Sequence, residues 1–198
     1  SLLATRTAAP DSLNDRCSSP LNPAANDINT LLVDPLYNQF VPSLGLAYIA
    51  SVMKAYGSVE VFEFRSHLKG HFKTLAEFRQ AEESALALLE KEMHEYDIIG
   101  VSVTVINYPR SLKVASLAHS RGKRVIFGGP FATILETIPA LRGQIFSDSH
   151  NSVDMVVQGD GIVPMHEVAQ RLQEGGPLVD IKGTSTIESG RYYRNPRG

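Results

Sequence analysis

Glycines that follow two short apolar runs are the residues of this chain whose spacing points most directly to chemistry. Residues 125–127 run into Gly128-Gly129-Pro130, and residues 153–157 run into Gln158-Gly-Asp-Gly161. A buried parallel strand that ends in glycine can bring its bare backbone close to a ligand. Ligands of open α/β sheets sit at the carboxyl edge of the strands. The two glycine turns therefore predict a ligand site at such an edge.

Five strand-then-helix patterns position these turns. The patterns predict strands at residues 28–33, 59–64, 97–103, 123–127 and 153–157, and helices at 43–57, 74–96, 109–121, 133–141 and 164–174. Five β-then-α units in a row predict an α/β fold with a Rossmann-like (flavodoxin-like), doubly wound, five-stranded parallel sheet. Residues 184–187 and 191–194, separated by Glu-Ser-Gly, predict a short C-terminal β-hairpin.

Length and composition predict one domain with appended segments. The chain has 198 residues, 43% of them hydrophobic, and a formal net charge of -2, which offers no basic face for a nucleic acid. Its apolar stretches are too short to span a membrane, so we expect a cytoplasmic protein. We expect a flexible leader at residues 1–27, a binding domain at 28–176, and a hairpin and linker at 177–198.

Four loops would line the crevice of this sheet. In the strand order 2-1-3-4-5 the switch point lies between the first and third strands, and the flanking loops are residues 34–42, 102–108, 128–133 and 159–161. The first loop lacks the G-x-G-x-x-G turn of a dinucleotide site, and the chain has no P-loop. The loop residues are mostly apolar or small, which predicts a large, mostly uncharged ligand held by few polar contacts.

Five strings carry a resemblance to a known family. They are Leu31-Leu-Val-Asp-Pro35, Pro42-Ser-Leu-Gly-Leu-Ala-Tyr-Ile-Ala50, Asp97-Ile-Ile-Gly-Val-Ser102, Phe127-Gly-Gly-Pro-Phe-Ala-Thr133 and Gln158-Gly-Asp-Gly161. In this order, over about residues 28–175, they resemble the N-terminal cobalamin-binding domain of cobalamin-dependent radical SAM enzymes.

The resemblance implies cobalamin as the cofactor. In that family the corrin is expected to lie across the carboxyl edge of the sheet, with the dimethylbenzimidazole tail in the crevice. The cofactor-binding residues that it implies are Asp34, Pro35, Leu36, Tyr37, Asn38, Ser102, Val103, Thr104, Val105, Asn107, Gly128, Gly129, Pro130, Phe131, Ala132, Gly159, Asp160 and Gly161.

The chain departs from classical cobalamin proteins in its histidines. Those proteins carry D-x-H-x-x-G after the first strand, with the histidine on cobalt, and residues 34–42 contain no histidine. Arg65-Ser-His-Leu-Lys-Gly70 matches part of the motif, but it follows the second strand and has arginine in place of the aspartate, so we treat it as coincidence. The resemblance then implies cobalt without a protein histidine, with Tyr37, Asn38 and Gln39 nearest its lower face.

The cysteine count limits what this chain can do alone. A radical SAM [4Fe-4S] cluster needs three thiolates, and Cys17 is the only cysteine. We therefore expect the cluster and S-adenosylmethionine to bind in a missing catalytic domain or subunit, the partner of this chain in a parent enzyme such as a methyltransferase. This chain is expected to bind cobalamin and to carry no catalytic or metal-ligating residue of its own.

Two other functions stay open. One is a flavodoxin-like or receiver-like module that binds a small ligand or a protein surface, although Asp34 has no acidic neighbour in sequence. The other is a glycosyltransferase-like nucleotide-sugar fragment, which the uncharged crevice fits poorly. The Gly128-Gly129 pair can also serve as a tight turn without any ligand.

Overall fold

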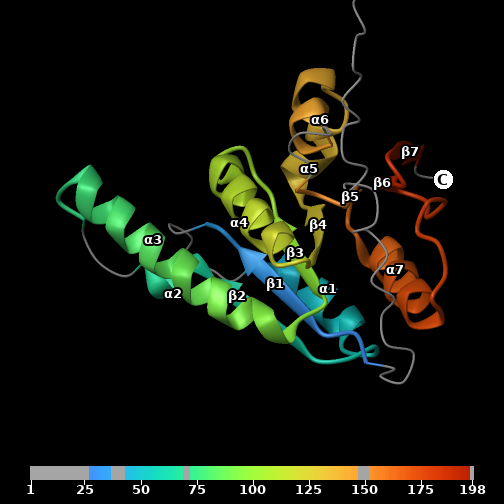
Figure 1. Ribbon diagram of the computed structural model, residues 1–198, viewed down its shortest axis with the longest axis horizontal. Coiled ribbons are helices and arrows are strands. Elements are labelled where there is room, and N and C mark those ends of the chain that lie inside the picture. Colours follow the sequence, from blue (N-terminus) through green and yellow to red (C-terminus); the bar gives the residue numbers. More distant parts are fainter. Residues whose placement is uncertain (1–26, 37–42, 69–71, 147–151, 197–198) are drawn as a thin grey trace, which may run out of the picture.

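A seven-stranded sheet forms the centre of the molecule (Figure 1). The computed structural model describes residues 27–36, 43–68, 72–146 and 152–196. The strand order is β2-β1-β3-β4-β5-β6-β7. The strands are β1 (Thr30–Asp34), β2 (Val59–Glu63), β3 (Ile98–Ser102), β4 (Arg124–Gly128), β5 (Met155–Val157), β6 (Thr184–Glu188) and β7 (Arg191–Asn195).

The first five strands are parallel and have the predicted order, with the switch point between β1 and β3. The sheet has seven strands, two more than the five that were predicted. The hairpin β6–β7 joins the same sheet, because β6 pairs antiparallel with β5 and places Val157 opposite Thr184. This pairing satisfies the backbone groups along the outer edge of β5, which a five-stranded sheet would leave open.

Helices follow most of the parallel strands. They are α1 (Leu44–Met53), α2 (Phe64–His67), α3 (Leu75–Glu92), the 3-10 turn η1 (Met93–Glu95), α4 (Tyr108–Ser120), α5 (Pro130–Leu135), α6 (Pro139–Ile145) and α7 (Ile162–Glu174). Hydroxyl N-caps begin two of them: Ser43 Oγ accepts from the N–H of Leu46, and Thr74 Oγ1 accepts from the N–H of Glu77.

The prediction of one helix over residues 133–141 was wrong. The segment contains two short helices, α5 and α6, which are separated before Pro139. Ile138 is extended, with φ -102° and ψ 109°, because the proline ring disfavours helical backbone in the residue that precedes it.

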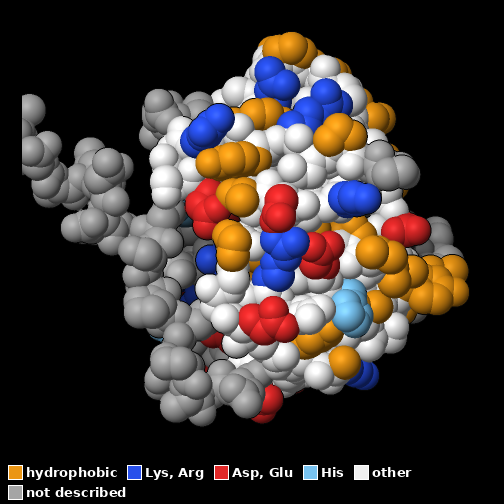
Figure 2. Space-filling model, turned by 90° about the vertical axis from the view of Figure 1, so that its right-hand side faces the viewer, with side chains coloured by type: hydrophobic (Ala, Val, Ile, Leu, Met, Phe, Trp, Pro, Cys, Tyr) orange, Lys and Arg blue, Asp and Glu red, His pale blue; other side chains and the backbone are white. Residues whose placement is uncertain are grey.

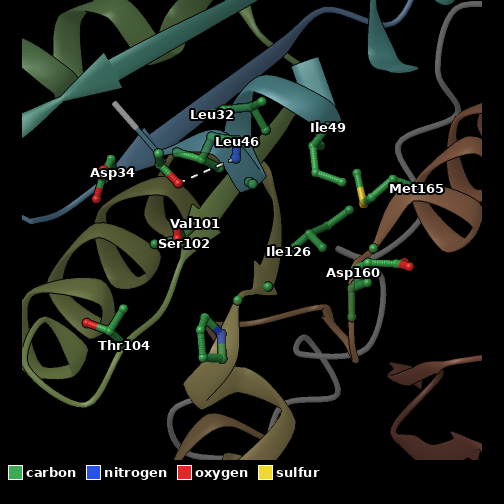
Figure 3. Close-up of a pocket in the computed structure, with 18 of the residues that line it drawn as sticks. Leu32, Asp34, Leu46, Ile49, Val101, Ser102, Thr104, Ile126, Asp160 and Met165 are labelled. Carbon is green, nitrogen blue, oxygen red and sulfur yellow. Dashed lines mark hydrogen bonds between the residues drawn. The ribbon is translucent and has the colours of Figure 1, made fainter. Parts of the chain in front are cut away.

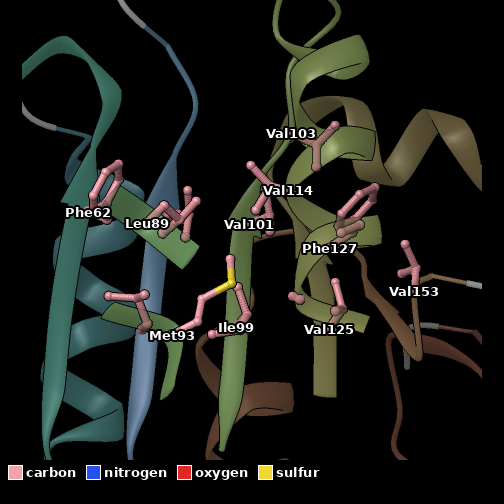
Figure 4. Packing of buried hydrophobic residues seen from close by; sticks show 14 of the residues in the cluster. Phe62, Leu89, Met93, Ile99, Val101, Val103, Val114, Val125, Phe127 and Val153 are labelled. Carbon is pink, nitrogen blue, oxygen red and sulfur yellow. The ribbon is translucent and has the colours of Figure 1, made fainter. Parts of the chain in front are cut away.

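Two apolar layers enclose the sheet. On one face, alternate strand residues such as Val33, Val101 and Phe127 pack against α3 and α4 (Figure 4). On the other face, Ile126 and Met155 belong to a cluster that includes residues of α1 and α7. Both faces of the parallel strands are therefore covered, as expected of a doubly wound sheet.

Charged side chains of both signs mix on the surface. Figure 2 shows acidic and basic groups close together on the face that carries α7 and the hairpin, where Arg171 pairs with Glu167 and Asp180. Among the described residues, no helix is both long and apolar enough to cross a membrane. The predicted leader lies outside the described residues, apart from Asp27.

Candidate functional site

A pocket of about 440 Å³ lies at the carboxyl end of the parallel strands. Its floor is the sheet face that α1 and α7 cover. Leu32, Gly100 and Ile126 are register partners across β1, β3 and β4, and all three line the pocket. Two residues further along, Ser102 of β3 is the partner of Gly128 of β4, and both line it as well.

Glycine leaves this floor open at Gly128. No heavy atom beyond its chain neighbours lies within 4 Å of the position that a Cβ would take there. Gly100 differs, because a Cβ there would lie 2.8 Å from Cδ2 of Leu32, which leans over it. Gly128 is therefore the position at which the absence of a side chain adds to the open volume of the pocket.

Helices α1 and α7 form the opposite wall (Figure 3). Ile49 of α1, Met165 of α7 and Ile126 of β4 point toward one another at one end. Gly161 sits at the N-terminus of α7 with φ +75°, and a Cβ there would come within 3.2 Å of Cδ1 of Ile49. A side chain at this position would thus strain the backbone and crowd the wall.

At position 129 the backbone requires glycine whether or not a ligand is bound. Its φ is +94°, and a Cβ would lie 3.0 Å from the carbonyl oxygen of Val103. The tight-turn explanation therefore accounts for Gly129, but not for Gly128, where the backbone tolerates a side chain.

The pocket carries few charges. The only ionisable side chains among its described lining residues are Asp34 and Asp160, and none of these residues is Lys, Arg or His. Ser102 and Thr104 add hydroxyls. A site with this lining suits a mostly apolar ligand with a few polar groups, and its volume falls within the usual range of small-molecule sites.

Asp34 is the buried acid of the site, with 2% of its surface exposed. Burial raises the pKa of its carboxyl, and the nearby Glu63 raises it further, while the N–H of Leu36 and the charge of Arg65 lower it. Asp34 Oδ1 accepts from that N–H at 3.1 Å. The carboxyl can accept a hydrogen bond when charged and donate one when protonated.

Asp160 lies in the exposed turn between β5 and α7. Its Oδ1 accepts from the N–H of Ile162 at 3.2 Å, and the N–H of Gly159 donates to Thr133 Oγ1 at 3.2 Å. The second bond ties the turn after β5 to α5, so the two glycine turns, which lie far apart in sequence, form one rim.

Ten of the eighteen predicted cofactor-binding residues line the pocket. They are Asp34, Leu36, Ser102, Thr104, Gly128, Gly129, Pro130, Gly159, Asp160 and Gly161. Tyr37 and Asn38, together with Gln39, lie outside the described residues.

Six predicted residues lie elsewhere. Val103 and Ala132 are buried in the core on the α3–α4 face, with Phe131 packed against it. Pro35 and the exposed Val105 are not among the pocket-lining residues. Asn107 is buried and shapes its own loop: it accepts from the N–H of Thr104 at 2.7 Å and donates to the carbonyl of Ser102 at 2.9 Å.

Other lining residues were not among the predicted cofactor-binding residues, although Thr133 ends one of the loops predicted to line the crevice. They are Leu32, Ser43, Gly45, Leu46, Ile49, Gly100, Val101, Ile126, Thr133, Val157 and Met165. Strand residues two positions before a predicted loop residue share its face, so Gly100 and Ile126 could have been found from Ser102 and Gly128. The helix residues carry no such signal.

The histidine of the partial motif, His67, lies away from the pocket. The ring of His67 stacks on Phe62 at 4.4 Å, and Phe62 belongs to the core on the α3–α4 face. No group of His, Cys, Asp and Glu side chains that could hold a metal ion occurs among the described residues.

The fold is similar to a part of two solved radical enzymes that contain cobalamin. The radical S-adenosylmethionine methyltransferase TsrM from Kitasatospora setae, with cobalamin and a [4Fe-4S] cluster bound, matches 87% of this chain with a TM-score of 0.61 and 17% identity. OxsB, with aqua-cobalamin and S-adenosylmethionine bound, matches 87% with a TM-score of 0.62 and 16% identity. This chain covers 29% of TsrM and 22% of OxsB.

A relative found by sequence is also named as a methyltransferase, as TsrM is. An uncharacterized methyltransferase of Pyrococcus horikoshii, PH0819, is 24% identical over 159 residues, which is 78% of this chain and 30% of that protein. No protein-family model matches the chain. The chain thus spans less than a third of each of these proteins.

Proposed function

We propose that this chain is the cobalamin-binding domain of a radical SAM enzyme, and that the whole enzyme is a methyltransferase. The observation that carries the proposal is the pocket at the switch point of the sheet. It is apolar, it holds no cationic side chain among its described lining residues, and its floor is left open at Gly128. The proteins with the same fold include two with cobalamin bound.

The size of the pocket indicates which part of cobalamin it would receive. A volume of about 440 Å³ is too small for the whole cofactor but suits one flat heterocycle with its sugar. We therefore assign the pocket to the nucleotide tail, between the floor at Gly128 and the wall formed by Ile49 and Met165. The corrin would lie outside, over the exposed rim at Pro130 and Asp160.

A few polar groups among the lining residues would hold the ligand. Asp34, Ser102 and Thr104 offer a carboxyl and two hydroxyls beside apolar walls. Bound cobalamin would supply a cobalt centre that can carry a methyl group. The residues of this chain would bind and orient the cofactor and exclude water from its tail.

We further propose that cobalt has no protein histidine beneath it. Among the described residues, His67 packs on the sheet face opposite the pocket, and His166 of α7 lies against Tyr56. Electron paramagnetic resonance of the cob(II)alamin form, prepared with unlabelled and ¹⁵N-labelled protein, tests this. Identical spectra support the proposal, and a hyperfine pattern that changes with the protein label overturns it.

The [4Fe-4S] cluster and S-adenosylmethionine belong, in this proposal, to a radical SAM domain or subunit beyond this chain. Nucleic acid and membrane are not proposed partners, and the cytoplasm is the proposed compartment. The coding sequence beyond Gly198, or of a neighbouring subunit, should contain three closely spaced cysteines. A parent enzyme without them would contradict the radical SAM assignment.

Cobalamin binding is directly measurable on the purified chain. The protein is titrated with hydroxocobalamin, under aerobic and reducing conditions, and then desalted. Retained red colour and a shifted corrin absorption band are expected, with the same protein unfolded in urea as the control. Colourless protein and no spectral change under either condition would overturn the proposal and favour a flavodoxin-like interaction module.

A further inference from the structure

Arg110 is the one described arginine that reaches from the helix after β3 to the turn after β1. It lies in the first turn of α4, and its Nη1 donates to the carbonyl oxygen of Pro35 at 2.5 Å. Residues 34–36, which we call the β1 turn, begin the connection between β1 and α1. Asp34 and Leu36 of this turn line the pocket.

The bond crosses the switch point of the sheet. β1 and β3 are neighbours, but the chain leaves β1 toward α1 on one face and leaves β3 toward α4 on the other. The crevice opens where these two connections diverge. A hydrogen bond from Arg110 to Pro35 therefore joins the two sides of the crevice directly beside the pocket.

Buried contacts fix the guanidinium in this place. Only 9% of the Arg110 side chain is exposed. Its Nε donates to Glu82 Oε1 at 2.6 Å, and the rings of Phe64 and Phe78 lie 5.5 and 5.7 Å from its Cζ. A buried guanidinium is costly unless it is paired, and here the charge, the rings and the carbonyl compensate together.

Glu82 is held in turn by a second cation. Lys113 Nζ donates to Glu82 Oε2 at 2.6 Å, and 53% of the Lys113 side chain is exposed. Burial would raise the pKa of Glu82, but the hydrogen bonds from Lys113 and Arg110 outweigh it and lower the pKa. The carboxylate is thus charged at neutral pH and presents Arg110 to the β1 turn.

We propose that Arg110 is a positioning residue for the pocket, which sets the β1 turn through Pro35 without touching the ligand. Pro35 has no N–H, so its carbonyl is the only backbone hydrogen-bonding group by which it can be held. The residues on either side of Pro35 are joined to each other, because the N–H of Leu36 donates to Asp34 Oδ1. Arg110 therefore fixes the place of the buried carboxyl and of Leu36 at the pocket, and its effect on cobalamin rests on the proposed function.

Lys113 supplies a matched control. Arg110→Met and Lys113→Met each remove one cation from Glu82, but only the first removes the bond to Pro35. Arg110→Lys keeps a cation near Glu82 without the planar fork that reaches two acceptors, so we expect it to behave like Arg110→Met at the β1 turn.

The first measurement is amide hydrogen exchange on the full chain without ligand. In Arg110→Met the Leu36 amide should exchange at least about tenfold faster, because a charged buried hydrogen bond that holds its turn is lost. The core amide of Leu89 reports the overall loss of stability and normalises both variants. Lys113→Met should leave the normalised exchange of Leu36 unchanged.

The second measurement is a hydroxocobalamin titration. Arg110→Met should bind about tenfold more weakly, and Lys113→Met within about twofold of the unaltered chain. Equal normalised exchange of Leu36 in the two variants would overturn the positioning role, whether or not cobalamin binds. An unaltered chain that binds no cobalamin would instead overturn the proposed function.

Discussion

Replacing Gly128 by valine tests whether the open floor of the pocket is used by a ligand. The backbone at Gly128 has no positive φ, and the space where a Cβ would lie is empty. A β-branched residue at the end of β4 should therefore change the free energy of unfolding by less than about 1 kcal/mol. In the complex, the added isopropyl group would meet the ligand.

The expected loss of binding follows from overpacking. Forcing extra methyl groups into an occupied site costs about 1–3 kcal/mol, which corresponds to roughly 5- to 150-fold weaker binding. The assay is a titration of hydroxocobalamin followed by corrin absorption, with urea unfolding of each variant. Gly143→Val is the control, because Gly143 of α6 also has an empty Cβ position but lies outside the pocket. A folded Gly128→Val protein with undiminished affinity would refute the reasoning.

Three further predictions concern stability and are measured by urea unfolding. Glu82→Gln should lower the free energy of unfolding by about 2 kcal/mol at pH 7, because hydrogen bonds from two cations are weakened. Since the pKa of Glu82 is lowered in the folded chain, the difference between the two proteins should shrink as the pH falls below about 4.5. A difference that stays constant with pH would contradict this. Burial raises the pKa of Asp154, and the N–H of Val125 lowers it by less, so the contribution of this carboxyl to stability is full below pH 3.8 and is lost as the pH rises. Asp154→Asn should therefore gain stability relative to the unaltered chain as the pH rises above 3.8. Parallel pH profiles of the two proteins would count against this. The buried Glu136 accepts a hydrogen bond from the hydroxyl of Tyr192 at 2.5 Å. Glu136→Ala should therefore lower the free energy of unfolding by about 1–3 kcal/mol and loosen the hairpin β6–β7. An unchanged unfolding midpoint would exclude a stabilising role of Glu136.

Local chemistry made much of the fold predictable. Ser43 and Thr74 were readable as helix starts because their hydroxyls cap N–H groups within three residues. The glycine turns after β4 and β5 were readable because Gly129 and Gly161 require a backbone that other residues rarely adopt. These are interactions between sequence neighbours, so the sequence alone specifies them.

The face of each strand was not predictable in the same way. Parallel strands are apolar on both sides, so alternation alone does not show that Ser102 faces the pocket while its neighbour Val103 faces the opposite core. Asn107 was assigned to the ligand from its loop and the family resemblance, yet its amide binds the backbone of its own loop. The contribution of Met165 depends on how α7 packs across the sheet, which is a long-range property.

The affinity of the chain for cobalamin relative to cobinamide, which lacks the nucleotide tail, tests the central claim most directly. Burial of an aromatic heterocycle of this size in an apolar pocket predicts at least about a hundredfold tighter binding of cobalamin, measured by parallel calorimetric titrations. Equal affinities for the two corrinoids would contradict the assignment of the pocket to the tail.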